Sequence, residues 1–237
     1  METTPQGPRR VLKTRNAAWA QSLARAVRST GVRPNSISVL SVLFAALAMA
    51  AYLLAPDMPT PGTCAMCWLA AAACIQFRLL CNMLDGMVAV EGGRASPTGP
   101  VYNEAPDRLA DVLILVGAGY STQVEPGVIK LFDSLPLGWT CAVLAMGTAY
   151  VRLLQGTLTG EQSFIGPMAK QHRMAVLTGG TLLAMAEQML RSSRPADEHV
   201  SGIWLALVVI ALGSAFTCIR RLRLITASLN PAQDKAH

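Results

Sequence analysis

Long apolar runs alternate along the chain with short polar segments. Four runs without a charge cover residues 37–55, 58–77, 134–151 and 203–219, and two shorter ones cover residues 112–124 and 174–186. An α-helix needs about 20 mostly apolar residues, with a lower limit near 17, to cross the hydrocarbon core of a bilayer. The shorter runs reach this length when a charged residue is allowed at one end. The pattern therefore predicts six membrane-spanning helices, over residues 37–55, 64–88, 105–123, 136–155, 173–190 and 202–220.

The composition supports the same class of protein. Apolar residues make up 52% of the 237 residues and charged residues only 14%, whereas about a quarter of a soluble domain is charged. The chain has too little polar surface to cover a globule of this size in water. We therefore expect an all-α integral membrane protein.

The distribution of basic residues predicts an orientation. Arginine and lysine collect before the first apolar run, in the loops that follow the second and fourth spans, and in the tail. The opposite side carries only Lys130, Arg191 and Arg194. By the positive-inside rule both termini are cytoplasmic. The net charge of +6 follows from this orientation and from attraction to anionic lipid, so it gives no reason to expect nucleic acid as a partner.

The segment before the first span has an amphipathic pattern. Apolar and basic residues alternate at helical spacing, with Leu12, Trp19, Leu23 and Val27 opposite Arg10, Lys13, Arg25 and Arg28. This pattern predicts a short helix on the inner membrane surface, and the alternative is a disordered basic leader. The expected organisation is an interfacial segment over residues 1–34, a six-helix membrane domain over 35–224, and a tail over 225–237.

Polar residues interrupt the apolar pattern at one boundary of the membrane. Arg78, Asn82 and Asp85 end the second predicted span and share one helix face, because they are four and then three residues apart. After a loop rich in glycine and proline, a second helix carries oxygen-bearing side chains at every fourth position, namely Asn103, Asp107 and Asp111. Such residues are unfavourable in a bilayer and usually mark function.

The side chains of this cluster are typical ligands of hard cations. Carboxylate and amide oxygens suit Mg²⁺ or Mn²⁺ better than metals that prefer thiolate or imidazole. The candidate metal ligands are Asn82, Asp85, Asn103, Glu104, Asp107 and Asp111. The alternative is a set of ordinary interfacial residues in which Asp107 and Asp111 pair with Arg108 or Arg94. The number of oxygen-bearing side chains on two consecutive helices favours the functional interpretation.

The same stretch resembles the signature of the CDP-alcohol phosphatidyltransferases, D-x2-D-G-x2-A-R-x8-G-x3-D-x3-D. Every spacing is matched, and the signature positions are held by Asn82, Asp85, Gly86, Ala89, Val90, Gly99, Asn103 and Asp107. The pair Pro34–Asn35 before the first span and Tyr150-x-Arg152 in the fourth are also similar to the family. The resemblance implies six spans with both termini inside, and a homodimer in a bacterial inner membrane whose active site faces the cytoplasm.

Three positions depart from this signature. Asn82 and Asn103 stand where the signature has aspartate, and Val90 stands where it has arginine. An asparagine oxygen can coordinate a hard cation but brings no negative charge. An alternative register places Asp107 and Asp111 at the last two positions after an insertion of four residues. We favour the first register because it needs no insertion.

The resemblance also implies a reaction. An alcohol attacks the phosphorus attached to the lipid of a CDP-linked donor such as CDP-diacylglycerol, and CMP leaves, as in phospholipid synthesis. Asp85 would be the principal ligand of Mg²⁺ or Mn²⁺, and Asp107 the general base. The CDP moiety would contact Asp85, Gly86, Ala89 and Gly99.

Basic residues near the fourth and fifth spans suggest an acceptor pocket. Arg152, Lys170 and Arg173 would favour an anionic alcohol such as a phosphorylated polyol, although anchoring by the positive-inside rule explains them equally well. Two other functions remain open. One is a catalytically weak relative that binds a CDP-lipid or metal without turnover, and the other is an unrelated small transporter.

Overall fold

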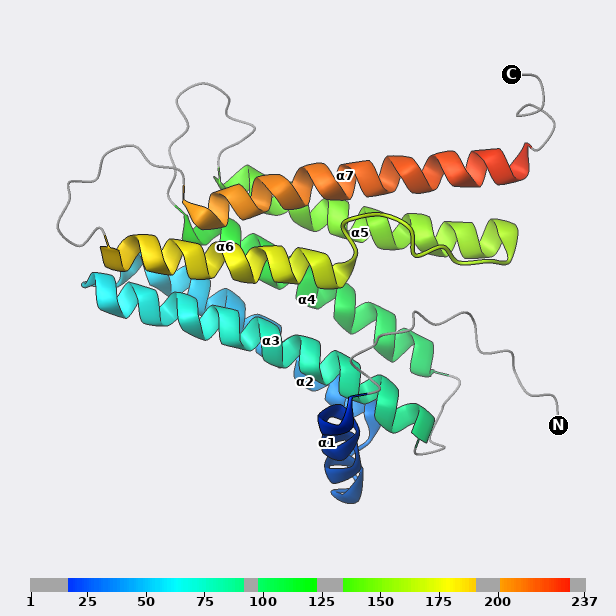
Figure 1. The fold of residues 1–237 in the computed structure, drawn as a ribbon, viewed down its shortest axis with the longest axis horizontal. Helices are drawn as coiled ribbons and strands as arrows, with labels where there is room; N and C mark the ends of the chain where they lie inside the picture. Colours follow the sequence, from blue (N-terminus) through cyan, green and yellow to red (C-terminus); the bar gives the residue numbers. More distant parts are fainter. Residues whose placement is uncertain (1–16, 92–97, 123–133, 191–200, 231–237) are drawn as a thin grey trace.

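The computed structural model describes residues 17–91, 98–122, 134–190 and 201–230. Every regular element within them is helical, which confirms the all-α fold class. The elements are α1 (Ala18–Ser29), α2 (Pro34–Leu54), the short 3-10 helix η2 (Ala55–Asp57), α3 (Pro61–Glu91), α4 (Gly99–Ser121), α5 (Ser134–Thr159), α6 (Lys170–Leu190) and α7 (Gly202–Leu229) (Figure 1). Each of the six predicted spans coincides with one of the helices α2 to α7.

Helices α3 and α4 extend beyond the predicted spans 64–88 and 105–123. Helix α3 continues to Glu91, and α4 already begins at Gly99. Pro100 is compatible with this start because the N–H groups of a first helical turn have no partner within the helix. Signature residues from Asn82 to Ala89 and from Gly99 to Asp107 are therefore helical.

The chain is a membrane protein with several candidate spans. Among the described residues, four helical segments are long and apolar enough to cross a bilayer: Pro34–Asp57, Pro61–Ala89, Pro136–Thr159 and Gly202–Leu229. Helices α4 and α6 lie on the other two predicted spans but carry more polar residues, including Asp107, Asp111 and Arg173. The count of six spans and the orientation remain predictions.

The distribution of side-chain sizes fits a membrane environment. Small residues such as Ala48, Ala71 and Ala110 are fully buried between helices, whereas large apolar residues such as Leu47 and Leu212 are exposed. Small residues at helix contacts let the backbones approach closely, which is how helices associate in lipid.

The six long helices form a closed ring. Each packs against two neighbours in the cyclic order α2, α3, α6, α7, α5 and α4. Side-chain hydrogen bonds join α3, α4 and α6 near the first turn of α6. This arrangement brings the N-terminal part of α6 next to the signature residues on α3 and α4, although the two segments are far apart in sequence.

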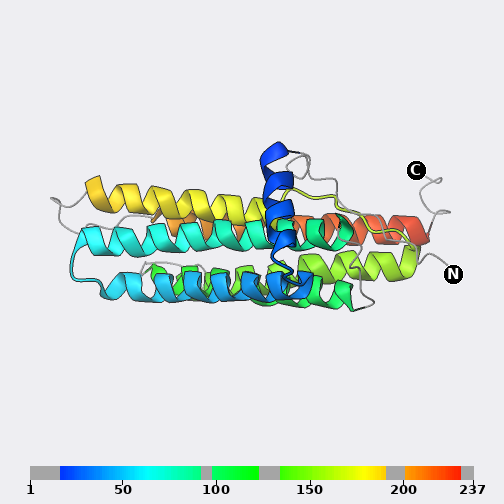
Figure 2. The same ribbon diagram turned by 90° about the horizontal axis from the view of Figure 1, so that it is seen from below.

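Helix α1 lies across the long helices at a steep angle (Figure 2). Its buried residues Ala20 and Ala24 pack with Cys81 and Leu84 of α3, and Trp19 is exposed. Gly31 has a φ angle of 76° at the turn into α2, a conformation that glycine adopts without steric conflict. The predicted N-terminal helix is therefore present over 18–29, while Leu12 lies outside the described residues.

The backbones of helices α6 and α7 lie close together at two glycines. A Cβ atom added to Gly180 would lie 2.5 Å from the carbonyl oxygen of Gly202, and one added to Gly202 would lie 2.7 Å from the carbonyl oxygen of Gly180. No side chain fits at either position without separating the helices.

We expect Gly180→Ala to lower the free energy of unfolding by about 1–3 kcal/mol, because the added methyl group overpacks the α6–α7 contact. Gly179→Ala is the matched control, since a Cβ at Gly179 meets no atom within 4 Å and alanine favours helix by about 1 kcal/mol over glycine. Reversible denaturation in mixed micelles measures both variants. Equal stabilities for the two would contradict this packing.

Candidate functional site

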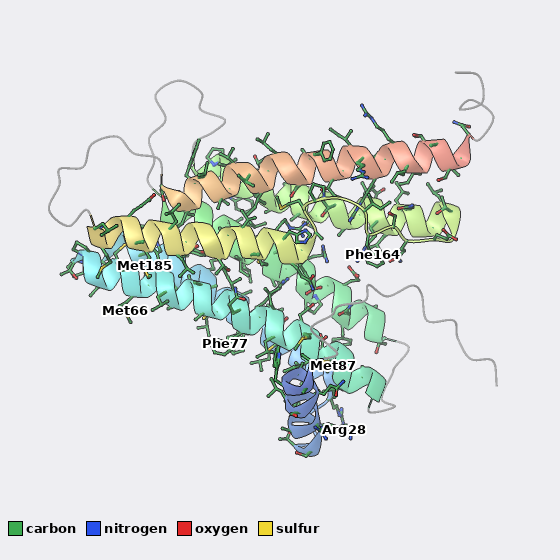
Figure 3. The ribbon with its side chains drawn as sticks, viewed as in Figure 1. Arg28, Met66, Phe77, Met87, Phe164 and Met185 are labelled. Carbon is green, nitrogen blue, oxygen red and sulfur yellow. The ribbon has the colours of Figure 1, made fainter. Side chains whose placement is uncertain are left out.

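Charged and polar side chains from α3, α4 and α6 meet inside the helix ring. Met87, labelled in Figure 3, marks the end of α3 that carries them, and Met66 and Met185 mark the opposite end of the bundle. Arg78, Asp107, Asp111 and Arg173 are almost fully buried here. Buried charges are unfavourable unless they are paired, so the pairing defines the site.

Asp111 on α4 is held between two arginines. Its Oδ1 accepts a hydrogen bond of 2.8 Å from Nη2 of Arg78 on α3. Its Oδ2 accepts one of 2.7 Å from Nη2 of Arg173 on α6. Arg173 also donates to the Thr148 hydroxyl of α5 at 3.1 Å and to the Met168 carbonyl at 2.9 Å. Both carboxylate oxygens are thus bound to guanidinium groups that tie α4 to α3, α5 and α6.

Asp107 lies one turn before Asp111 and has a different set of partners. Its Oδ1 accepts hydrogen bonds from Nδ2 of Asn82 and, at 3.4 Å, from Nη2 of Arg78. Its Oδ2 accepts a hydrogen bond from Nζ of Lys170, which also donates to Oδ1 of Asn82. Asn82, Asp107 and Lys170 therefore form a closed triangle of donor–acceptor contacts.

Asp85 lies on α3 one turn after Asn82 and is buried. Its Oδ2 accepts a hydrogen bond of 2.7 Å from the Ser38 hydroxyl of α2. Its Oδ1 is buried and has no hydrogen-bond partner within the described part of the chain. A buried carboxylate oxygen without a partner is unfavourable, so this atom is a position where a bound cation or donor would stabilise the site.

The two remaining candidate ligands lie towards the rim. Asn103 is exposed on the second turn of α4. Glu104 accepts a hydrogen bond of 2.5 Å from Nη2 of Arg152 on α5 and lies 3.5 Å from Nη2 of Arg108. The guanidinium carbon of Arg152 also lies 5.6 Å from the centre of the Phe164 ring, the residue labelled beside α5 in Figure 3.

The predicted acceptor residues already have carboxylate partners. Arg152 binds Glu104, Lys170 binds Asp107, and Arg173 binds Asp111. Lys170 and Arg173 lie on the first turn of α6, next to the signature residues, and Arg152 lies on α5 at the rim.

The residues predicted to contact the CDP moiety lie on the same two helices, α3 and α4. Gly86 and Ala89 follow Asp85 on α3, and Gly99 is the first residue of α4. Gly86, Ala89 and Gly99 are all half-buried. Arg94, named above as a possible partner of Asp107 and Asp111, lies outside the described residues.

The donor set fits one hard cation better than two. Among the described residues, no group of three or more His, Cys, Asp or Glu side chains is arranged to hold a metal ion. Asp111 and Asp107 direct their oxygens at protein donors, whereas Asp85 keeps Oδ1 open. A divalent ion at Asp85 would have one carboxylate oxygen from the protein and would take its other ligands from substrate and water, as Mg²⁺ often does.

Three crystal structures of phosphatidylinositol phosphate synthase (PgsA1) from Mycobacterium tuberculosis have a similar fold. With CDP-DAG bound, the TM-score is 0.66 at 19% identity, covering 88% of this chain and 94% of that one. In complex with manganese and citrate, the TM-score is 0.66 at 19% identity, covering 87% and 88%. The apo form gives 0.62 at 19% identity, covering 85% and 93%.

No family model and no curated protein matches the chain. The similarity at this identity establishes the fold, and the fold is the one that the resemblance implied. The chain therefore has the same fold as PgsA1.

Two features of the site were missed in the sequence. Ser38 had no recognisable signal, although it follows the Pro34–Asn35 pair by one helical turn. The contacts of Lys170 and Arg173 with Asp107 and Asp111 were also missed, and the assignment of both residues to an acceptor pocket stays a prediction. The helical spacing of Lys170 and Arg173, three residues apart, was the available signal that both face the same partner helix.

We expect Arg173→Met to lower the free energy of unfolding by about 3–5 kcal/mol, because it leaves Oδ2 of Asp111 buried without its cation. Arg223→Met on the exposed face of α7 is the control and should have little effect. Reversible denaturation in mixed micelles compares the two. If both variants are as stable as the original protein, the Asp111 pairing does not support the fold.

Proposed function

We propose that the chain transfers a substituted phosphate group from a CDP-linked lipid, such as CDP-diacylglycerol, to an alcohol. It would thus be a CDP-alcohol phosphatidyltransferase of phospholipid synthesis. The observation that best supports this proposal is that Asp85 and Asp107, at matched signature positions, are buried within one site. The fold resembles PgsA1, whose structure with CDP-DAG bound matches most of this chain.

The reaction is a substitution at phosphorus. The alcohol oxygen forms a bond to the phosphorus attached to the lipid, the bond from that phosphorus to the CMP oxygen breaks, and CMP leaves as an anion. The negative diphosphate repels the nucleophile, so the site must supply positive charge. Arg78 and Lys170 lie beside Asp107 and meet this requirement with groups of the chain itself.

Asp107 is the residue that we assign as general base. A carboxylate that accepts the alcohol proton increases the nucleophilicity of the oxygen. Asp107 Oδ2 is bound by the terminal amine of Lys170, a flexible side chain at the first residue of α6. Movement of this amine towards the diphosphate would free Oδ2 for the alcohol. Asp111 has both oxygens bound to arginines, which supports the register that places Asp107 at the last signature position.

We assign Asp85 as the ligand of Mg²⁺ or Mn²⁺, through the unpartnered Oδ1. Such an ion would neutralise the diphosphate and stabilise the leaving CMP oxygen. PgsA1 has been crystallised in complex with manganese. In this proposal Asn82, Asn103, Glu104 and Asp111 are weaker candidates, because Asn82 and Asp111 face protein donors, Asn103 is exposed and Glu104 pairs with Arg152.

The remaining contacts follow from the same placement. Gly86, Ala89 and Gly99 would contact the nucleotide, because Gly86 and Ala89 follow Asp85 on α3 and Gly99 is the first residue of α4. The site would face the cytoplasm in a six-span protein of the inner membrane, and the protein would be a homodimer. The basic residues beside α5 and α6 would bind the alcohol, and an anionic acceptor would have to displace Glu104 from Arg152.

Binding of a CDP-lipid without turnover is the second candidate function. The contact of Lys170 with both Asn82 and Asp107 favours it, because it occupies the proposed base. CMP release distinguishes the two functions, since only the transferase produces it.

We expect the purified protein to release CMP from CDP-diacylglycerol when Mg²⁺ or Mn²⁺ and a suitable alcohol are present. Asp107→Asn should reduce this rate by about 10²-fold or more, because the alcohol proton loses its acceptor. A radiolabelled donor and a panel of neutral and phosphorylated alcohols provide the assay.

The matched control is Asp57→Asn, an exposed aspartate in η2, which should keep full activity. Binding of CDP-diacylglycerol without CMP release for any alcohol would replace the transferase with the binding function. Full activity of Asp107→Asn would show that Asp107 is not the base.

A further inference from the structure

The side chain of Lys170 occupies the space between two signature positions. Its ammonium group donates to Oδ1 of Asn82 and to Oδ2 of Asp107. In a signature with aspartate at both positions, two carboxylates would face each other here and would need a cation between them. In this chain a covalently attached cation is already present at that place.

Asn82 matches this arrangement in a way that aspartate would not. Its amide oxygen accepts from Lys170, and its amide nitrogen donates to Oδ1 of Asp107. An ionised carboxylate only accepts hydrogen bonds, so an aspartate at position 82 would lose the contact with Asp107 and repel it. Asparagine instead of aspartate at position 82 is therefore compatible with the position of the Lys170 ammonium group.

The backbone position of Lys170 is fixed by the residues around it. It is the first residue of α6, and the backbone N–H of Arg173 closes this first turn by donating to the Ala169 carbonyl at 3.0 Å. Arg173 is itself held by Asp111, Thr148 and Met168. Lys170 thus starts from an anchored turn and reaches the α3–α4 contact with a side chain that is 21% exposed.

The charges of the inner site balance when Lys170 is included. Asp85, Asp107 and Asp111 provide three negative charges, and Arg78, Lys170 and Arg173 provide three positive ones. Glu104 lies at the rim with Arg108 and Arg152. Arg108 also lies 3.9 Å from Oδ2 of Asp107 and adds further positive charge there. The inner site therefore has no excess negative charge that would attract a second divalent ion. The diphosphate of the donor brings negative charge when it binds, and a single ion at Asp85 would neutralise that charge.

We propose that the Lys170 ammonium replaces one divalent ion, so that the chain binds a single Mn²⁺ or Mg²⁺, at Asp85, and excludes an ion between positions 82 and 107. This inference deepens the proposed function and rests on it for the role of the site. Lys170 is a positioning residue here, which holds Asn82 and Asp107 together and supplies charge at the point where the diphosphate would bind.

Counting bound Mn²⁺ tests this inference without any turnover. The signal of free Mn²⁺ in electron paramagnetic resonance is titrated against the purified full-length protein in detergent, with and without CDP-diacylglycerol. We expect about one Mn²⁺ per chain for the original protein and about two for the double variant Asn82→Asp/Lys170→Met, whose carboxylates at positions 82 and 107 face each other without a cation. Lys170→Arg, which keeps the charge, should still bind about one.

Each outcome of the titration decides the point. Two bound ions in the original protein would overturn the inference, and so would an unchanged count in a folded double variant. Thermal unfolding in detergent shows whether the double variant is folded, and the count for the original protein remains decisive if it is not. Failure of the proposed function has a different signature, since no alcohol would then give CMP release while the Mn²⁺ count stayed at one.

Discussion

Asp111, held between Arg78 and Arg173, is the interaction on which the arrangement of the site depends. The three side chains come from α4, α3 and α6 and are at most 1% exposed. Three buried charges would be strongly unfavourable without pairing, so these helices can pack only in the register that joins them. That register places Asp107 opposite Asn82 and brings Lys170 to both. The catalytic proposal and the cation proposal therefore rest on the same three buried side chains.

The fold separates two tasks along the helices. The half of the bundle that contains the Gly180–Gly202 contact is built from small and apolar residues and holds the ring together. The other half holds the buried charges, and α1 lies across the outside of α3 at that end (Figure 2). Polar residues on α4 and α6 reduce the hydropathy of these two helices, which explains why they resemble membrane spans less than their neighbours do. A polar site inside an apolar ring suits a reaction between a lipid donor and a soluble alcohol.

Helix positions were predictable from the sequence because the apolar runs are long and their limits are marked by charges. The ends of α3 and α4 were not, since both helices continue into polar residues that carry no hydrophobic periodicity. Pairing of Asp107 and Asp111 with arginines was the alternative interpretation of the sequence. The structure shows Arg78 and Arg173 as partners of Asp111, while Arg108 lies 3.9 Å from Asp107. Contacts such as Lys170 with Asn82, 88 residues apart, and Ser38 with Asp85, 47 residues apart, depend on how the helices pack. Local spacing shows that Asn103 and Asp107 are one turn apart, yet only the packing shows that Asn103 is exposed and Asp107 is buried.

We expect a CDP-linked lipid to bind between α3 and α4, with its diphosphate beside Asp85, Asp107 and Lys170. A structure of the protein with CDP-diacylglycerol and Mn²⁺, with the metal located by anomalous scattering, tests this most directly. We expect one manganese ion bound to Asp85 and a diphosphate oxygen, the nucleotide along Gly86 and Gly99, and the Lys170 amine close to the phosphates. A nucleotide bound outside the α3–α4 contact, or manganese bridging Asn82 and Asp107 with Lys170 displaced, would contradict it.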